Sequence, residues 1–360
     1  MKLSLSPRPF FLRMAVAVLL VFAAVVPCRA AAPRATLVLL NWPDYMDPAL
    51  LRAFEAQHDV RVREVHYETE ANMDQLLSYT GGKKYDLVIA SHTKVPSFVR
   101  RGWLAPVDRA QVPNLKHLDT GNLPHDEELI RYAVPHLWGT VGIAYRTDLV
   151  REKITGWRQF FRPGKELRGR IMMIGDVRDV VGAALKAQGH SLNAGDPAAL
   201  AGAEKLLLAQ RPYVKKYGYM PINRQSDLIR GNYWLAMVYN GDALTLADLD
   251  PNIAFVTPAE GTSLWLDSIM VLKASSQQRL AFQFVNFLHE PQNAAQLANF
   301  VSMATPNVAA RKLLPREHLD NPAIYPPQAV LDKCEFYAPL PPRTLKRYNE
   351  IFTRASQGLR

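Results

Sequence analysis

The sequence contains very little cysteine, since only Cys28 and Cys334 occur among its 360 residues. If an N-terminal segment that includes Cys28 is removed, the mature chain keeps a single thiol and can form no internal disulfide. Its stability must then come from the burial of a hydrophobic core. The hydrophobic share of 48% and the charged share of 21% fit an ordinary globular protein.

The N-terminal apolar run, residues 14–26, is too short to span a bilayer, because its length of about 13 residues falls below the roughly 20 that a transmembrane helix needs. Three basic residues precede it, namely Lys2, Arg8 and Arg13. Small residues follow the apolar run and precede a cleavage site after Ala30. A basic region, an apolar region and a small-residue cleavage site, in this order, are typical of a secretory signal peptide. We predict a signal peptide over residues 1–30. The pair Val26-Pro27 before Cys28 argues against a lipid anchor.

Long basic runs are missing as well. The full chain has a formal charge of +10, of which four charges lie in the predicted signal peptide, leaving +6 for the mature protein. Its basic residues are dispersed in pairs such as Lys83-Lys84 and Arg100-Arg101. Net charge governs solubility and steering, whereas recognition of a ligand depends on the groups at its site. We therefore expect a solvated basic surface and no nucleic-acid partner.

Familiar catalytic motifs do not occur in the sequence. Gly-x-Ser-x-Gly, His-Glu-x-x-His and a catalytic-cysteine context are all missing, and the nine histidines are scattered. This pattern predicts no enzyme activity, no metal site and no cofactor. A secreted hydrolase or transferase is the alternative from another functional class.

The length of the mature chain predicts two lobes, because about 330 residues exceed the roughly 250 to 300 at which single cores stop growing. In the first part the expected elements are strand 36–40, helix 48–57, strand 60–67, helix 71–80 and strand 85–90. Asp47 is a good N-cap for the first helix, and Gly81-Gly82 ends the second. Alternating strands and helices predict a mostly parallel sheet covered on both faces.

An extended, aromatic-rich run over residues 132–145 marks the crossing into a second lobe. The elements expected after it are strand 170–174, helices 180–188, 197–210 and 227–230, strands 233–239, 253–257 and 264–272, and helices 278–289, 291–301 and 344–353. We assign residues 31–138 and 257–307 to lobe 1, and residues 139–256 and 308–360 to lobe 2. Such chain crossings form a hinge, which is typical of proteins that close around a ligand.

Residues 37–45 read LVLLNWPDY, so an apolar strand runs directly into polar and aromatic residues before a helix begins. This places Trp42, Asp44 and Tyr45 where open α/β sheets bind small ligands. An indole, a phenol and a carboxylate suit an organic cation better than an anion. For this segment alone, a buried tryptophan with a turn-capping aspartate is an equally good interpretation.

The segment 41–45 (NWPDY) also resembles the N-terminal signature of the periplasmic polyamine-binding proteins, the spermidine/putrescine receptors of ABC importers. Further segments follow in the order of that family, namely 85–91 (YDLVIAS), 135–140 (PHLWGT), 240–242 (NGD), 265–268 (WLDS) and 324–327 (IYPP). Each is weak singly, but the ordered set is specific and spans nearly the whole mature chain. The sequence is thus similar to the bacterial extracellular solute-binding proteins.

The resemblance implies an α/β, two-lobed periplasmic-binding-protein fold of type II. Each lobe would hold a mixed, mostly parallel sheet flanked by helices, with the ligand cleft between the lobes. It further implies a monomeric periplasmic receptor that captures putrescine, spermidine or a related amine for an inner-membrane ABC permease. A same-fold receptor for an anion or for ferric iron is the alternative, although sites of those kinds do not explain carboxylates that alternate with indoles.

A polyamine carries an ammonium at each amine, so its receptor must supply carboxylates with apolar or aromatic walls between them. Four carboxylates match the family's pattern: Asp44, Asp179, Asp242 and Asp267. Asp176 and Asp179 lie between a strand and a helix, so one should cap the helix and the other should be free to bind. The family tends to place a longer acid at position 179, and the shorter Asp leaves room for water or a bulkier ligand.

The strand segment Trp265-Leu266-Asp267 places Trp265 and Asp267 on one face. A charge buried there is costly unless a partner meets it. A ligand ammonium is the expected partner, and a salt bridge to a nearby arginine is the alternative. Residues 240–242 follow an apolar strand and place Asp242 at the rim of the crevice, with a hairpin-type turn as the alternative.

Besides position 179, two further positions depart from the family's pattern. Tyr239 stands where relatives usually have tryptophan, and Met303 stands where they carry a cleft tyrosine. Both departures affect the choice of ligand more than its chemical class. The complete set of expected ligand contacts is Trp42, Asp44, Tyr45, Ser91, Asp176, Asp179, Tyr239, Asp242, Trp265 and Asp267.

Overall fold

The computed structural model describes residues 34–119, 121, 123–124 and 126–359. Within this part of the chain, Thr36–Arg360 forms one compact unit. The predicted signal peptide, residues 1–30, lies outside the described residues. Among the helices that are described, none is both long and apolar enough to cross a membrane.

Ten strands of the described chain form a mixed sheet in the order β2-β1-β3-β9-β4-β7-β5-β6, with β10 beside β9 and β8 beside β4. They are β1 (Thr36–Asn41), β2 (Arg61–His66), β3 (Leu87–Ser91), β4 (Val134–Arg146), β5 (Ile171–Met173), β6 (Val214–Tyr217), β7 (Leu235–Tyr239), β8 (Ile253–Val256), β9 (Ser263–Val271) and β10 (Glu335–Phe336). β1 is parallel to β2 and β3, and β5 is parallel to β6 and β7. β9 and β4 are antiparallel to their main neighbours.

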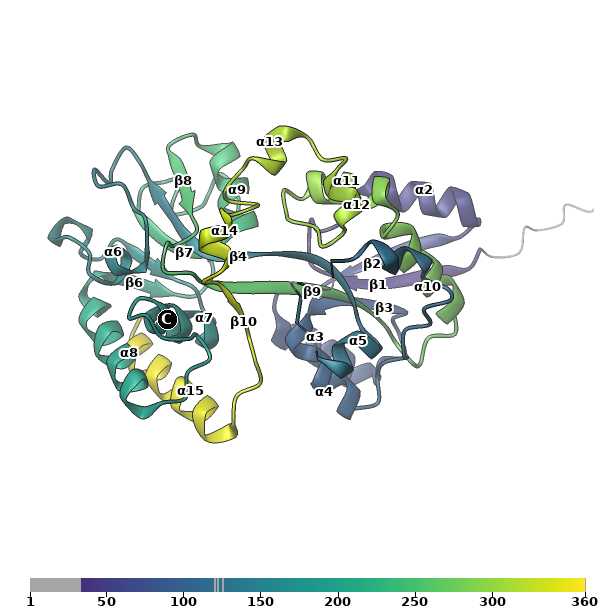
Figure 1. Ribbon diagram of the computed structural model, residues 1–360, viewed down its shortest axis with the longest axis horizontal. Coiled ribbons are helices and arrows are strands. Elements are labelled where there is room, and N and C mark those ends of the chain that lie inside the picture. The colour runs from purple at the N-terminus through teal and green to yellow at the C-terminus, as the bar shows by residue number, and fades with distance from the viewer. Residues whose placement is uncertain (1–33, 120, 122, 125, 360) are drawn as a thin grey trace, which may run out of the picture. The chain divides into compact units, whose positions relative to one another are not determined.

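Two long strands belong to both halves of the sheet. β9 pairs with β3 on one side and with the first part of β4 on the other, whereas the second part of β4 pairs with β7 and β8. Figure 1 shows β4 and β9 running from the half with β1–β3 to the half with β5–β8. The chain therefore crosses where the aromatic run predicts it. The lobe limits 31–138 with 257–307 and 139–256 with 308–360 stay a prediction.

Helices accompany both halves. Near β1–β3 are α2 (Pro48–His58), α3 (Glu70–Thr80), α4 (Val95–Arg100), α5 (Glu127–Tyr132), α10 (Gln278–Leu288) and α11 (Pro291–Phe300). The other half has α6 (Trp157–Phe161), α7 (Val177–Lys186), α8 (Pro197–Gln210), α9 (Asn240–Leu249) and α15 (Pro342–Ser356). Three short helices lie in the tail: α12 (Val308–Arg311), α13 (Arg316–Leu319) and α14 (Gln328–Leu331). As predicted, Asp47 caps α2 and Gly81 ends α3 in a left-handed conformation.

Two of the differences between the predicted helices and the structure have a clear local cause. Residues 227–230 form turns, because the carbonyl of Asp227 accepts from the N–H groups of Asn232 and Tyr233 and Gly231 adopts a φ of 73°. The helix expected over residues 180–188 begins earlier, at Val177, since Asp176 caps it. Turn and cap chemistry therefore decide both boundaries.

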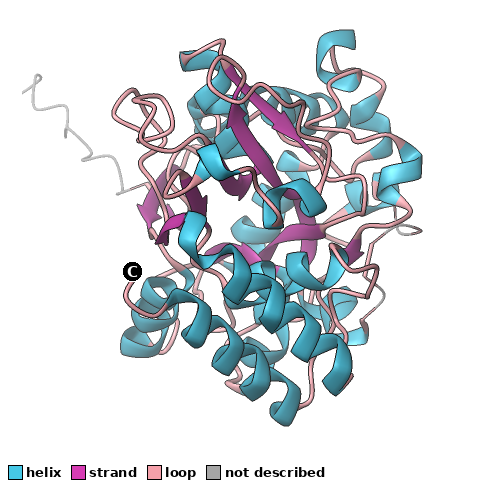
Figure 2. Ribbon diagram, turned by 90° about the vertical axis from the view of Figure 1, so that its left-hand side faces the viewer, coloured by secondary structure: helices cyan, strands magenta, loops and turns pink. Residues whose placement is uncertain are grey.

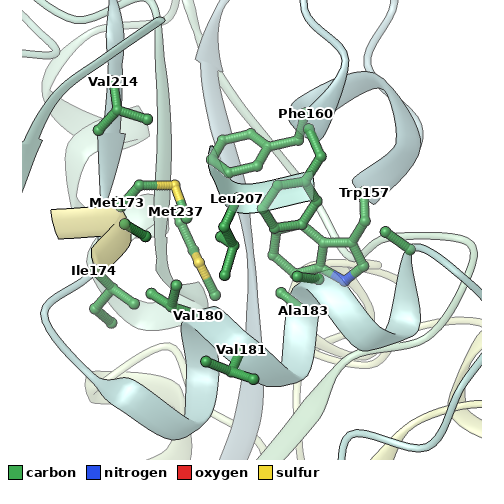
Figure 3. Packing of buried hydrophobic residues seen from close by; sticks show 14 of the residues in the cluster. Trp157, Phe160, Met173, Ile174, Val180, Val181, Ala183, Leu207, Val214 and Met237 are labelled. Atoms are coloured by element: carbon green, nitrogen blue, oxygen red, sulfur yellow. The ribbon is translucent and has the colours of Figure 1, made fainter. Parts of the chain in front are cut away.

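Each half has its own hydrophobic core. In the half with β5–β8, α7, α8 and α15 pack on one another, and Figure 2 shows a layer of helices against the strands there. Val180, Val181 and Ala183 of α7 lie in one buried cluster with Trp157 and Phe160 (Figure 3). Burial of this face holds α7 in place. The position of its polar N-terminus is therefore fixed by the core.

Candidate ligand-binding site

Asp267 lies in the middle of β9, between Ser91 of β3 and Leu137 of β4. Its residue exposure is 9%, and the Tyr45 hydroxyl donates to its Oδ2 at 2.9 Å. Burial raises the pKa of Asp267 to about 7, the hydrogen bond from Tyr45 lowers it in part, and Glu70 raises it further. Within the described chain no lysine or arginine forms a salt bridge with this carboxylate. The arginine pair considered as the alternative is thus not formed there.

Asp242 lies in the first turn of α9, not in a loop at the rim of a strand. The hairpin alternative is wrong, because the chain leaves β7 directly into this helix. A carboxylate in the first turn interacts favourably with the helix dipole. The side chain is half-buried, and burial raises its pKa to about 6.

Gly241 precedes Asp242 and contacts Met303. A Cβ atom at position 241 would lie 2.6 Å from the Met303 Cε atom, so the end of this flexible side chain would have to move. Met303, one of the departures from the family's pattern, is therefore a neighbour of the Asp242 turn. Gly241 therefore leaves room for this thioether side chain.

Asp176 caps α7, as the sequence predicts for one of these two aspartates, and the binding role of Asp179 stays a prediction. Asp176 is the N-cap of α7 and accepts from the N–H groups of Arg178 and Asp179 at 2.7 and 3.0 Å. Asp179 is buried, at 4% exposure, and accepts from three hydroxyl groups, those of Tyr239, Ser263 and Tyr337. Burial raises the pKa of Asp179 to about 7, the charge of Asp176 adds to this rise, and the hydroxyl groups oppose it.

A pair of variants at Asp176 separates its cap from its charge. Asp176→Ala removes both, so the free energy of unfolding should fall by about 1 kcal/mol, the usual cost of losing a cap. Asp176→Asn retains an accepting oxygen and should stay within roughly 0.5 kcal/mol of the parent. Chemical denaturation at pH 7 measures both. Equal losses in the two variants would show that the charge, and not the cap, stabilises α7.

The two tryptophan candidates pack against different cores, one in each half of the sheet. Trp42 packs against Tyr67 with a ring-centroid distance of 4.3 Å, at the edge of the core that holds Leu40 and Val88. Trp265 packs against the other core and lies so near Gly139 that a Cβ there would come within 2.4 Å of the indole. Both indole N–H groups are buried and have no partner among the described residues.

Asp44 and Ser91 are less enclosed than these residues. Asp44 is exposed, in a turn with a left-handed φ of 54°. Ser91 is half-buried and shares a hydrogen bond of 2.9 Å with Thr93. The structure thus brings Tyr45 and Ser91 to Asp267, and Tyr239 to Asp179, while Asp44 stays at the surface.

Sequence reasoning missed several charged and polar groups of this region. Glu70, the first residue of α3, acts electrostatically on both Asp267 and Asp176, which belong to β9 and to the cap of α7. Burial raises the pKa of Glu70, Lys94 lowers it, and Asp176 raises it again. Tyr337, which donates to Asp179, comes from the proline-rich tail. A glutamate after the cap residue Thr69 is ordinary in a helix, so the sequence held no signal for its role.

Carboxylates from both halves are therefore linked electrostatically, namely Glu70, Asp176, Asp179 and Asp267, and a further carboxylate, Asp242, lies in the first turn of α9. Aromatic side chains accompany them, and no set of histidine, cysteine, aspartate or glutamate suited to a metal ion occurs in the described part of the chain. Acidic groups beside indoles and phenols suit a ligand that is cationic and partly apolar. With its two sheet halves joined by β4 and β9, the molecule has the architecture of a two-lobed solute-binding protein.

The comparisons agree with this class. The chain belongs to the bacterial extracellular solute-binding protein family, whose model matches residues 49–322. It is 30% identical over 305 residues to the spermidine/putrescine-binding periplasmic protein of Salmonella typhimurium, which covers 84% of this chain and 86% of the relative. It is also 30% identical over 330 residues to the putrescine/cadaverine-binding protein of Pseudomonas aeruginosa. This match covers 88% of this chain and 92% of the relative.

Solved structures show the same fold. A spermidine/putrescine ABC transporter substrate-binding protein from Streptococcus pneumoniae aligns with a TM-score of 0.80 and 27% identity, over 89% of this chain and 98% of its own. The family and the two-lobed α/β class predicted from the sequence are therefore confirmed.

Proposed function

We propose that this protein is a receptor, not an enzyme, which binds a polyamine in the periplasm and delivers it to an ABC importer of the inner membrane. The carboxylate of Asp267 carries this proposal. It is buried, a tyrosine hydroxyl orients it, and it forms no salt bridge within the described chain. A buried charge is costly unless it is paired, and a ligand ammonium would be its partner.

The other candidate residues complete the proposed contacts. Asp267 and Asp242 hold one ammonium of the ligand, and Asp179, with the charge of Asp176 beside it, attracts another. A carboxylate has about four lone-pair positions, so the three hydroxyl groups on Asp179 leave room for one more donor. Asp44 and Ser91 contribute at the more exposed edge. The alkyl chain follows aromatic walls formed by Trp42, Tyr45, Tyr239 and Trp265.

The names of the relatives support the ligand class and the location. Those relatives are described as periplasmic proteins that bind spermidine, putrescine or cadaverine. An anion receptor would need cationic groups free to bind, whereas Lys94 is paired with Glu70 and Asp74, and Arg178 donates to Asn193 and to the carbonyl of Ala338. For a ferric iron site, no group of histidine, cysteine, aspartate and glutamate suited to a metal ion occurs within the described residues, and the neighbouring hydroxyls of Tyr239 and Tyr337 donate to Asp179. The cationic ligand is thus favoured.

Thermal unfolding with candidate ligands tests this function. A ligand that binds only the folded protein stabilises it by about 2.7 kcal/mol at 100 times its Kd. Putrescine, cadaverine or spermidine should therefore raise the Tm of the mature protein, whereas sulfate and ferric citrate should not. A rise with sulfate or ferric citrate and none with any amine would overturn the proposal.

Met303→Tyr should tighten polyamine binding by roughly three- to tenfold. The change adds a hydroxyl oxygen that can accept from an ammonium and an aromatic face beside the Asp242 turn, and contacts of a cation with a ring contribute roughly 0.5 to 2 kcal/mol. Calorimetry with putrescine measures the effect. Met303→Leu, which adds neither group, is the matched control and should stay within about twofold of the parent. Weaker binding by a folded Met303→Tyr protein would exclude a cleft position for this residue.

A further inference from the structure

Lys94 is a cation built into the acidic region of the first half. It ends the short helix η2 (His92–Lys94), which directly follows Ser91, the strand partner of Asp267. Its Nζ lies 3.1 Å from Glu70 Oε2 and 3.0 Å from Asp74 Oδ2. The Lys94 side chain is 19% exposed, so the ammonium is largely enclosed by its two partners. Two carboxylates around one ammonium are the arrangement that a receptor would offer to an amine of its ligand.

The Glu70 partner of Lys94 lies within electrostatic reach of the candidate site. Its charge raises the pKa of Asp267 in β9, after the larger effect of burial. Partial burial raises the pKa of Tyr219, a residue that is 54% exposed, and Asp176, Asp179 and Glu70 raise it further. Titratable groups from both halves of the molecule therefore interact electrostatically around Glu70. Lys94 thus adds positive charge to a region otherwise rich in carboxylates.

We propose that Lys94 takes the place of a third ligand amine, so that the receptor selects diamines over triamines. This inference rests on the proposed function and deepens it. Lys94 occupies both Glu70 and Asp74 and neutralises one of their two charges, which leaves Asp267 with Asp242 and Asp179 with Asp176 as the two places for ammonium groups. A triamine would bring a third ammonium toward Lys94, and like charges in a partly buried site repel one another. Specificity of this kind comes from a repulsive element within the site.

The ionisation of Lys94 agrees with this role. Burial lowers its pKa, but Glu70 and Asp74 outweigh burial and hold the pKa above its usual value. The ammonium is therefore charged throughout the neutral range, so it should repel a third ligand ammonium at pH 7 and at pH 8 alike.

Lys94→Met removes the ammonium and keeps an apolar stem of similar length. Calorimetry of the mature protein at pH 8 then compares putrescine with spermidine. We expect the ratio of spermidine to putrescine affinity to rise at least tenfold over the parent, with putrescine affinity itself changed less than threefold. Lys94→Met with Glu70→Gln removes the freed carboxylate and should return the ratio to within threefold of the parent. Lys273→Met, at an exposed lysine, is the charge-matched control and should leave it unchanged.

Lys94→Gln is a second variant, which retains a hydrogen-bond donor but no charge and should show the same rise if Lys94→Met does not fold. A parent that binds spermidine more tightly than putrescine would overturn the inference, as would an unchanged ratio in a folded variant, and in both cases the proposed function would stand. Tighter binding of 4-aminobutyrate than of putrescine, lost in Lys94→Met, would also overturn it by showing that Lys94 binds a carboxylate. A parent that binds no polyamine would overturn the proposed function together with the inference.

Discussion

Asp267→Asn is expected to weaken polyamine binding by more than about tenfold, the equivalent of 1.4 kcal/mol. Asparagine keeps the shape of the side chain and an oxygen that accepts from the Tyr45 hydroxyl, but it removes the charge. A charge-assisted contact is worth about 1.5 to 3 kcal/mol net, so its loss should dominate the change in affinity. Calorimetry at pH 8 measures this difference.

Asp248→Asn supplies the matched control, since Asp248 is an exposed carboxylate on α9, the helix that also carries Asp242. Its affinity should stay within about twofold of the parent. Without ligand, Asp267→Asn should unfold at a higher temperature than the parent at pH 8, because ionisation of the buried Asp267 opposes folding there. An Asp267→Asn protein that binds every tested polyamine as tightly as the parent would remove Asp267 from the site.

Affinity should fall by at least about 100-fold between pH 8 and pH 5. Burial raises the pKa of Asp179 and Asp267 to about 7 and that of Asp242 to about 6, so acid protonates the groups that must be charged to hold an ammonium. The ligand amines stay charged over this range, so the change lies in the protein. A single carboxyl with a pKa near 7 already costs a factor of about 100 at pH 5.

Binding near pH 6.5 should therefore release protons, which calorimetry in two buffers with different ionisation enthalpies counts. The stability of the ligand-free protein should change in the opposite direction. A carboxyl whose pKa is higher in the folded than in the unfolded protein stabilises the folded state. This contribution is complete below the ordinary pKa of about 3.8, and it is lost as the pH rises through 6 to 7. Constant affinity from pH 8 to pH 5 would exclude all three carboxylates as ligand contacts.

The fold was predictable where local chemistry and tertiary structure agree. Asp47 caps α2 and Gly81 ends α3 as the sequence indicates, because each satisfies backbone groups that any helix end exposes. The helix predicted over residues 227–230 is wrong, because the hydrogen bonds of the turn that ends at Gly231 form in place of a short helix. Asp242 was expected at a strand edge, and it lies in the first turn of a helix because β7 continues directly into α9.

The candidate site was predictable in part, and its missing members have a physical explanation. Tyr45 and Asp267 are 222 positions apart in sequence, and Tyr337 is 158 positions from Asp179, so their contacts depend on how the two halves fold. The sequence motifs predicted the site residues that lie within a strand or directly after one. Glu70 and Lys94 lie on helices with ordinary local patterns, and only the folded chain brings them beside the junction.

Titration calorimetry of the mature protein with putrescine, cadaverine, spermidine, spermine and agmatine at pH 8 tests the central claim most directly. We expect at least one amine to bind with a Kd in the micromolar range or below, with putrescine tighter than spermidine, and with affinity reduced more than tenfold in both Asp267→Asn and Asp242→Asn. The absence of binding heat with all five amines, at several temperatures, would contradict the claim that this protein is a polyamine receptor. Affinities in both variants equal to that of the parent would contradict the site.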